Sequence, residues 1–325
     1  MAASLLELNG VRKDYRIRKY GRVVKTYNAL NNLSFKVEKG QIFGFLGPNG
    51  AGKTTTIKCI TGILKCDEGT ISIDGENIEY NHFENKNKIG FLPEQVGLYR
   101  SLTAIETLQF YGAFYSLSDS VIDKKGTKLL EILGLGNSSE KTVNEFSLGM
   151  RKRLALATAL LHEPEILILD EPTSGLDPRG VKALRTLLLD LNKDGLTILL
   201  SSHILSEVQE LCTDVGIINN GKMIRQESIS KIVETVEKTA IKLSLRVNEF
   251  NNESEKLLQK KKGIEIIEKK DIGKHKTIIL KLKEDLIPWV TDKLVANGIN
   301  IFSIEPQNTT LEDVFLTETE DENEA

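Results

Sequence analysis

The chain has 325 residues, of which 40% are hydrophobic and 27% charged, the composition of a folded globular protein. Its net charge of −3 excludes a global field that recruits nucleic acid, and no apolar run reaches the roughly 18 residues that a membrane span needs. The three cysteines show no metal-binding spacing, and the N-terminus lacks the regions of a signal peptide, so we expect a reduced, cytoplasmic compartment. The length predicts two domains.

The first distinctive segment is basic. Residues 12–25 carry seven basic side chains and one acid. This pattern favours a solvated hairpin between two edge strands. A surface that touches anionic lipid head groups is the alternative.

The next segment predicts a nucleotide site. Residues 47–55 read GPNGAGKTT and fit G-x-x-x-x-G-K-[ST], the phosphate-binding P-loop. An apolar run at 41–46 predicts a buried strand before the loop, and 55–64 has helical spacing after it, so a helix N-terminus faces the anion. Lys53 is expected to reach the β- and γ-phosphates and the Thr54 hydroxyl to ligate Mg2+. The expected phosphate-binding residues are Gly47, Asn49, Gly50, Ala51, Gly52, Lys53, Thr54 and Thr55.

The middle of the chain alternates between strand-like and helix-like segments, which predicts an α/β fold. Further strands are expected at 88–92, 166–169 and 197–201, and the last two are nearly all apolar, as in a parallel sheet buried on both faces. Helical periodicity without strong strands at 103–115, 121–133 and 150–161 predicts a helical subdomain at about 96–165.

Two carboxylates end one of these strands. Residues 166–171 read ILILDE, so a buried strand delivers Asp170 and Glu171 to the same end of the sheet as the P-loop. Asp170 is the expected second Mg2+ contact. Glu171 is expected to polarise the water that attacks the γ-phosphate.

The pattern changes after about residue 230. Strands are expected at 239–247, 264–268, 277–283 and 299–304, with helices at 251–262 and 285–297. The order βαββαβ predicts a small α+β, ferredoxin-like domain at 231–317. It carries no catalytic constellation, so a regulatory or dimer-supporting role is the hypothesis. The acidic residues 318–325 are expected to be a disordered tail.

With these motifs, the chain resembles the ATP-binding subunit of an ABC transporter over about residues 5–225. Residues 170–178 (DEPTSGLDP) match the Walker B segment and D-loop of that family, 146–150 (FSLGM) its signature motif, and 201–203 (SSH) its H-loop. The resemblance implies a P-loop NTPase fold for residues 1–230, with ATP and Mg2+ bound. The signature motif usually has two glycines after the serine, and here Leu148 replaces the first.

The resemblance also implies roles for individual residues. Glu171 and His203 are expected to be catalytic, with His203 bonding the γ-phosphate. Ser147 and Gly149 are expected to face the nucleotide bound by a partner subunit, and Asp177 to lie between the two sites. Tyr15 is our choice for the aromatic that stacks on adenine, with Tyr20 and Tyr27 as alternatives.

One motif is ambiguous. The family carries a metal-contacting glutamine after the strand predicted at 88–92, and here Glu94 stands at that position with Gln95 next to it. Both residues stay candidates for this contact.

The resemblance finally implies partners and a place in the cell. Residues 308–316 (NTTLEDVFL) and the signature variant are similar to ATPases of drug, antibiotic and lipid exporters. We therefore expect a homodimer or heterodimer of ATPase subunits that drives a separate membrane permease, peripheral to the inner face of the cell membrane, without nucleic acid. A soluble ABC ATPase uncoupled from transport is the alternative.

Overall fold

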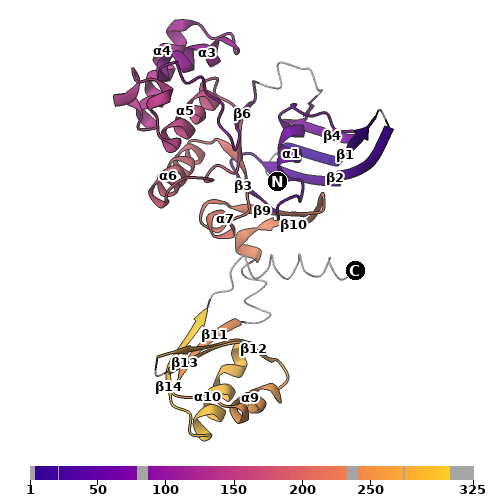
Figure 1. The fold of residues 1–325 in the computed structure, drawn as a ribbon, viewed down its shortest axis with the longest axis vertical. Coiled ribbons are helices and arrows are strands. Elements are labelled where there is room, and N and C mark those ends of the chain that lie inside the picture. Colours follow the sequence, from indigo (N-terminus) through magenta and orange to yellow (C-terminus); the bar gives the residue numbers. More distant parts are fainter. Residues whose placement is uncertain (1–3, 21, 79–86, 233–240, 274, 308–325) are drawn as a thin grey trace. The chain divides into compact units, whose positions relative to one another are not determined.

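The computed structural model describes residues 4–20, 22–78, 87–232, 241–273 and 275–307 (Figure 1). The chain divides into two compact units, Met1–Ser228 and Ile229–Ala325, and each has its own hydrophobic core. The predicted acidic tail and the exporter-like segment 308–316 lie outside the described residues. Among the described helices, none has both the length and the apolar character to cross a membrane.

The centre of the first unit is a six-stranded sheet in the order β10-β9-β3-β8-β7-β6. All neighbours pair in parallel except β10, which runs antiparallel to β9. The strands are β3 (Ile42–Leu46), β6 (Ile89–Leu92), β7 (Ile166–Asp170), β8 (Thr197–Ser202), β9 (Asp214–Asn219) and β10 (Lys222–Ser228). Four of them were predicted, and β3, β7 and β8 are buried throughout, as their apolar runs require.

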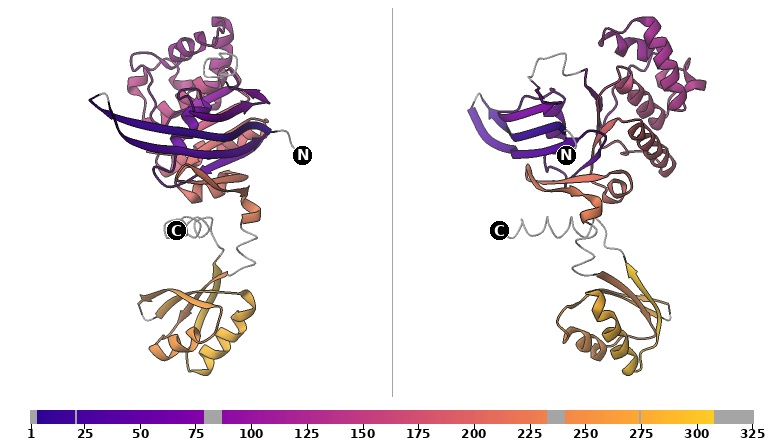
Figure 2. Two further views of the ribbon diagram at one scale, coloured as in Figure 1. Left: turned by 90° about the vertical axis from the view of Figure 1, so that its right-hand side faces the viewer. Right: turned by 180° about the vertical axis from the view of Figure 1, so that it is seen from behind.

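A second, antiparallel sheet in the order β2-β1-β4-β5 lies beside the first (Figure 2). Its strands are β1 (Ser4–Lys19), β2 (Arg22–Glu38), β4 (Glu68–Ile73) and β5 (Glu76–Asn77). β1 and β2 form the hairpin that the basic segment predicted. One core cluster joins this sheet, helix α1 (Lys53–Ile60) and the central sheet. In it Phe35 stacks on Phe43 and Phe45, with ring centroids 5.6 and 5.2 Å apart.

The predicted helical insertion is present. Its helices gather on the side of the central sheet opposite to β1 and β2 (Figures 1 and 2). They are α3 (Ala104–Ala113), α4 (Asp119–Ile132) and α5 (Leu148–Leu160), with the 3-10 helices η1 (Gly136–Ser138) and η2 (Val143–Glu145). Two more helices, α6 (Pro178–Lys193) and α7 (Leu205–Leu211), connect strands of the central sheet. The signature segment, residues 146–150, lies at the N-terminus of α5.

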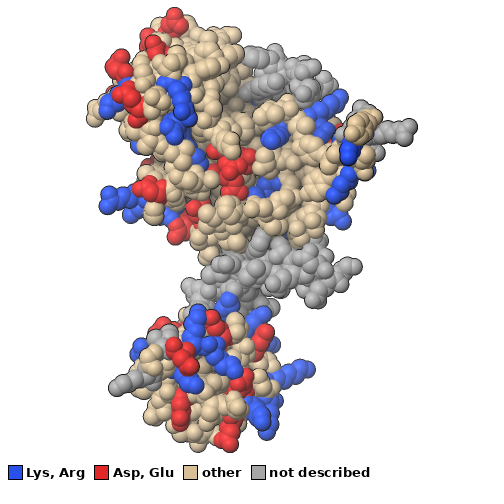
Figure 3. Space-filling view, in the orientation of Figure 1, with Lys and Arg blue, Asp and Glu red and all other residues tan. Residues whose placement is uncertain are grey.

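The second unit has the predicted βαββαβ order of elements. They are β11 (Ile241–Val247), α9 (Asn252–Gln259), β12 (Ile264–Ile272), β13 (His275–Leu282), η3 (Glu284–Leu286), α10 (Ile287–Ala296) and β14 (Ile301–Gln307). The strands form an antiparallel sheet in the order β12-β13-β11-β14, and both helices cover one of its faces (Figure 1). Basic and acidic side chains are interspersed on the face of this unit that Figure 3 draws.

Candidate functional site

The P-loop links β3 to α1 and is shaped by a glycine that no other residue can replace. Gly52 precedes α1 with φ 111°, and a Cβ there would lie 2.7 Å from the Ala29 carbonyl oxygen. The loop closes on Lys53, whose Nζ donates to the carbonyls of Gly47 (2.7 Å) and Pro48 (3.3 Å). Burial lowers the pKa of the Lys53 ammonium, and the charge of Glu171 opposes this shift. The loop therefore presents a desolvated cation, which gains more from a phosphate than an exposed lysine would.

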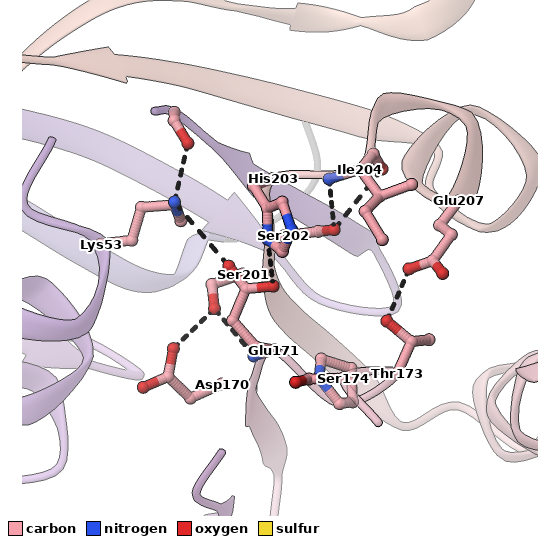
Figure 4. A network of polar contacts seen from close by, with 12 residues as sticks. Lys53, Asp170, Glu171, Thr173, Ser174, Ser201, Ser202, His203, Ile204 and Glu207 are labelled. Carbon is pink, nitrogen blue, oxygen red and sulfur yellow. Dashed lines mark hydrogen bonds and ion pairs between the residues drawn. The ribbon is translucent and has the colours of Figure 1, made fainter. Parts of the chain in front are cut away.

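Asp170 ends β7 directly opposite Ser201 on the neighbouring strand β8. The Ser201 hydroxyl donates to Asp170 Oδ1 (2.7 Å; Figure 4). The Thr54 hydroxyl approaches the same oxygen at 3.5 Å. Only 4% of Asp170 is exposed, so these two hydroxyls hold a buried carboxylate beside the P-loop. The parallel sheet thus brings Asp170 next to Thr54, although 116 residues separate the two in the sequence.

Glu171 turns sharply away from the strand that delivers it. Its φ of 46° is left-handed, a conformation that costs a residue with a Cβ about 1–2 kcal/mol. The carboxylate lies between two cationic or polar groups, with Oε2 2.8 Å from His203 Nδ1 and Oε1 3.7 Å from Lys53 Nζ (Figure 4). Strain of this kind at a residue facing a site is typical of a functional position.

Lys152 on α5 was not predicted from the sequence. Its Nζ donates to the backbone carbonyls of Ser174 (2.6 Å), Pro172 (2.9 Å) and Glu171 (3.4 Å). Burial lowers the pKa of this ammonium, while the charges of nearby glutamates act in the opposite direction. A signal did exist: Lys152 precedes the buried Leu156 by one helical turn and so belongs to the buried face of α5.

Lys53, Thr54, Glu171 and His203 are among the residues that line a cavity of about 320 Å3. Its lining residues are Tyr27, Ala29, Pro48, Asn49, Gly50, Gly52, Lys53, Thr54, Thr55, Glu94, Glu171, Ser174 and His203. The predicted residues Gly47 and Ala51 belong to the same loop but are not among the lining residues. The cavity thus combines a phosphate-binding loop, a carboxylate and an imidazole, which is the equipment for hydrolysing a nucleoside triphosphate.

The structure brings Tyr27, rather than Tyr15, to the cavity. The two residues are paired across the β1–β2 hairpin, and the Tyr27 hydroxyl donates to the Gly50 carbonyl (3.0 Å). Tyr15 is not among the lining residues. Tyr20 is 95% exposed near the tip of the hairpin. Tyr27, one of the two alternatives, is therefore the aromatic nearest to the P-loop of the three.

The lining of the cavity also distinguishes Glu94 from Gln95, the two candidates for the metal-contacting position after β6. Both residues are exposed, and Glu94 lines the cavity whereas Gln95 does not. The position that the spacing after β6 aligned is thus the one that faces the P-loop.

The signature residues lie elsewhere on the unit. Ser147 caps the N-terminus of α5, where its Oγ accepts the Met150 N–H (3.2 Å). Neither Ser147 nor Gly149 lines the cavity around this chain's own P-loop. Asp177 caps α6 by accepting the Gly180 N–H (3.0 Å) and is exposed. These three residues therefore lie at the starts of α5 and α6, outside the lining of this cavity.

The donor set fits a magnesium ion. Thr54 and Asp170 offer the hard oxygen ligands that Mg2+ prefers. Within the described part of the chain, no group of three or more His, Cys, Asp or Glu side chains is placed to hold a metal. A site with one carboxylate and one hydroxyl suits Mg2+, since this ion completes its shell with water and substrate phosphates.

A larger hollow of about 520 Å3 has a different character. It is lined by Cys59, Gly62, Leu64, Lys65, Cys66, Gly69, Thr70, Ile71, Asn77 and Ile78. Only one of these side chains is charged, and no catalytic pair is among them. Size alone therefore does not mark the functional site.

Comparison with known proteins agrees with this geometry. A family model described as "ABC transporter" matches residues 30–174. The bacitracin transport ATP-binding protein BcrA of Bacillus licheniformis is 38% identical over 89% of this chain and 91% of its own length. The linearmycin resistance ATP-binding protein LnrL of Bacillus subtilis (strain 168) is 35% identical over 89% and 93%. The dimeric ATP-binding cassette MJ0796, bound to ADP and Pi, superposes with a TM-score of 0.62 at 26% identity, over 69% of this chain and 99% of that one.

Proposed function

The chain belongs to the ABC transporter family of ATP-binding proteins, and we propose that it pairs with a second ATPase subunit around two ATP molecules to drive a separate membrane permease. It is an ATP-hydrolysing transport subunit, as its relatives are. The observation that carries the mechanism is the position of the Glu171 carboxylate, between Lys53 of the P-loop and His203.

Glu171 is the proposed general base. Water attacks the γ-phosphorus, the bond from that phosphorus to the oxygen bridging it to ADP breaks, and the water's proton passes to the Glu171 carboxylate. The products are ADP and inorganic phosphate. His203 holds this carboxylate in place through Nδ1, and its other ring nitrogen remains to bond the γ-phosphate.

Lys53 changes partners in the proposed cycle. Its Nζ donates to the loop's own carbonyls at Gly47 and Pro48 and lies 3.7 Å from Glu171 Oε1. A triphosphate competes for these bonds with a higher charge density, so the ammonium moves to the phosphates. This exchange frees the carboxylate to face the water.

Thr54 and Asp170 are the proposed ligands of Mg2+, with Glu94 as the further contact in preference to Gln95. Bound Mg2+ neutralises the charge that develops on the β- and γ-phosphate oxygens. The Ser201 hydroxyl keeps Asp170 oriented, since it donates to Oδ1.

Dimerisation is proposed from the position of the signature residues. Ser147 and Gly149 lie at the N-terminus of a 13-residue helix, which is an anion-binding position. They do not line the cavity of their own chain, so a second subunit is needed to supply its phosphate. The solved MJ0796 cassette is itself dimeric.

The permease and its cargo are proposed from the relatives. BcrA is named for bacitracin transport and LnrL for linearmycin resistance. We propose that this chain serves an exporter of a peptide antibiotic or lipid-like compound, at the inner face of the cell membrane.

The first experiment compares the wild-type chain with Glu171→Gln. We expect the variant's ATP turnover to fall by about 10²–10⁴-fold, the usual contribution of a general base. Glu165→Gln is the matched control, because Glu165 is an exposed carboxylate just before β7. A Glu171→Gln variant with wild-type turnover would contradict the assignment.

The second experiment uses the same variant to test pairing. Because slow hydrolysis traps the ATP-bound state, Glu171→Gln should form dimers in saturating ATP and Mg2+, and monomers with ADP, by light scattering. A permanent monomer would contradict the proposed dimer. A membrane-spanning protein that co-purifies and stimulates ATPase activity when co-expressed would identify the permease.

A further inference from the structure

Three backbone carbonyls converge on one point behind Glu171. The turn after β7 is closed by a hydrogen bond from the Ser174 N–H to the Glu171 carbonyl (3.2 Å). The carbonyl oxygens of Glu171, Pro172 and Ser174 then lie 3.4, 2.9 and 2.6 Å from a single atom, Lys152 Nζ. Each of these oxygens carries partial negative charge, so a cation between them removes their mutual repulsion. The ammonium has three N–H donors, one for each carbonyl.

The lysine that fills this point comes from another element. Lys152 lies in the second turn of α5, and only 4% of it is exposed. Lysine is rarely buried so completely unless its charge is paired. Here the backbone carbonyls satisfy the ammonium. The arrangement therefore has a cost in desolvation that a neutral side chain would avoid, and it needs a reason.

The reason lies in the backbone of Glu171. Its φ of 46° is left-handed, and such a conformation persists only when its surroundings fix it. Three contacts do so. The Glu171 N–H donates to Ser201 Oγ (3.0 Å), and its carbonyl accepts from the Ser174 N–H (3.2 Å) and from Lys152 Nζ (3.4 Å).

We propose that Lys152 is a positioning residue for ATP hydrolysis, which holds the peptide of Glu171 in its left-handed conformation and so aims the carboxylate at the attacking water. The inference rests on the proposed function, in which Glu171 accepts the proton of that water. Lys152 is not among the residues that line the nucleotide cavity, so it acts through Glu171 rather than on ATP.

The test is Lys152→Met in the full-length chain, because methionine keeps an unbranched side chain, one heavy atom shorter, and removes the charge and the donors. We expect kcat for ATP to fall about 100-fold, the size of effect that a displacement of about 1 Å produces at a reacting group. KM for ATP should stay near its wild-type value, because the P-loop contacts are untouched. Loss of folded protein would instead lower the melting temperature and the fraction of protein that binds ATP.

Three further variants make the result specific. Lys152→Arg keeps the charge and the donors and should restore most of kcat, whereas Lys152→Gln, which retains only an amide donor, should fall between the two. Lys128→Met removes a lysine from the exposed face of α4 and should behave as wild type. The inference is overturned if Lys152→Met keeps wild-type kcat, or if KM rises in step with the loss of kcat.

A double variant shows whether the effect passes through Glu171. When Glu171→Gln has already removed the base, adding Lys152→Met should lower the residual rate no further. A second full loss of rate would mean that Lys152 acts elsewhere. An inactive wild-type chain would contradict the proposed function itself, whereas an active wild type with an unaffected Lys152→Met contradicts this inference alone.

Discussion

At the scale of single residues, the charged groups of the site bond to other groups of the protein. Lys53 bonds to two carbonyls of the P-loop, and Glu171 is held by His203. Each of these groups must give up or share a partner when phosphate enters. We therefore expect the affinity for ATP to depend also on residues around the P-loop that keep their contacts when phosphate binds. Tyr27 is one of these residues.

Tyr27 is expected to stack on the adenine base. Its ring lines the cavity and its hydroxyl anchors it to the Gly50 carbonyl. Stacking of a base on an aromatic side chain contributes about 1–3 kcal/mol, so Tyr27→Ala should raise KM for ATP roughly tenfold or more. Steady-state ATPase kinetics measure this, with kcat expected to change little.

The control for this prediction is the residue across the hairpin. Tyr15→Ala removes the same ring from the partner strand β1 and should leave KM nearly unchanged. Tyr27→Phe should also behave like wild type, since the ring does the stacking. A rise of KM in Tyr15→Ala alone would return the adenine contact to the residue that the sequence favoured.

Residues in local motifs could be predicted from the sequence, and residues held by distant contacts could not. The P-loop, Asp170 and Glu171 follow from strand ends and spacing, and His203 follows from the resemblance to the ABC family. Lys152 is different, because its partners are backbone carbonyls 19 to 22 residues away, which no side-chain pattern encodes. The roles assigned to Ser147 and Gly149 remain predictions until a dimer is tested.

At the scale of elements, the β9–β10 hairpin supports the P-loop. Asn220 and Gly221 form its tight turn with φ of 47° and 75°, the signs that a type I′ turn requires. The Gly221 N–H donates to the Ala51 carbonyl (2.9 Å), and its carbonyl accepts from Asn31 (2.8 Å). The turn therefore connects the P-loop to β2.

Gly221→Ala is expected to damage this support. The new Cβ would lie 2.7 Å from the Ala29 carbonyl oxygen, in a left-handed backbone that costs about 1–3 kcal/mol by itself. We expect the melting temperature of the first unit to fall by about 5 °C, and KM for ATP to rise because the loop shifts. Calorimetry and ATPase kinetics measure the two effects.

Gly75→Ala is a matched control at the β4–β5 turn. Gly75 has nearly the same φ, 78°, but a Cβ there would meet nothing within 4 Å. It should lower stability through backbone strain alone and leave KM unchanged. Equal changes of KM in both variants would remove the β9–β10 turn from the nucleotide site.

Apolar runs in the sequence identified the buried strands, and helical periodicity identified the helices of the insertion. The apolar strands β3, β7 and β8 and the helices α3, α4 and α5 were predicted within a few residues. The strands β4, β9 and β10 were not among the predicted strands. The Asn220-Gly221 dipeptide, flanked by an apolar strand, was a hairpin signal that could have identified β9 and β10.

At the scale of the whole molecule, the chain contains two separate hydrophobic cores. The second unit buries its own cluster, which includes Leu243, Leu245, Leu280 and Leu294. A unit with its own hydrophobic core and its own four-stranded sheet meets the requirements for folding alone. The predicted boundary near residue 230, and the regulatory or dimer-supporting role of this unit, remain predictions.

Residues 229–325 are therefore expected to fold when produced alone. The fragment should show one cooperative thermal transition by circular dichroism. Leu280→Ala, at a fully buried position, should destabilise it by about 2–5 kcal/mol. A fragment that lacks a transition would show that the second core depends on the first unit.

The strand β10 has a mechanical consequence for the nucleotide site. It pairs with β9 from Lys222, next to the Asn220–Gly221 turn, to Ser228, one residue before the second unit begins. A load carried along the chain from the second unit would therefore enter the hairpin at Ser228. The paired residues of β10 stand between that point and Gly221, whose N–H donates to the Ala51 carbonyl of the P-loop.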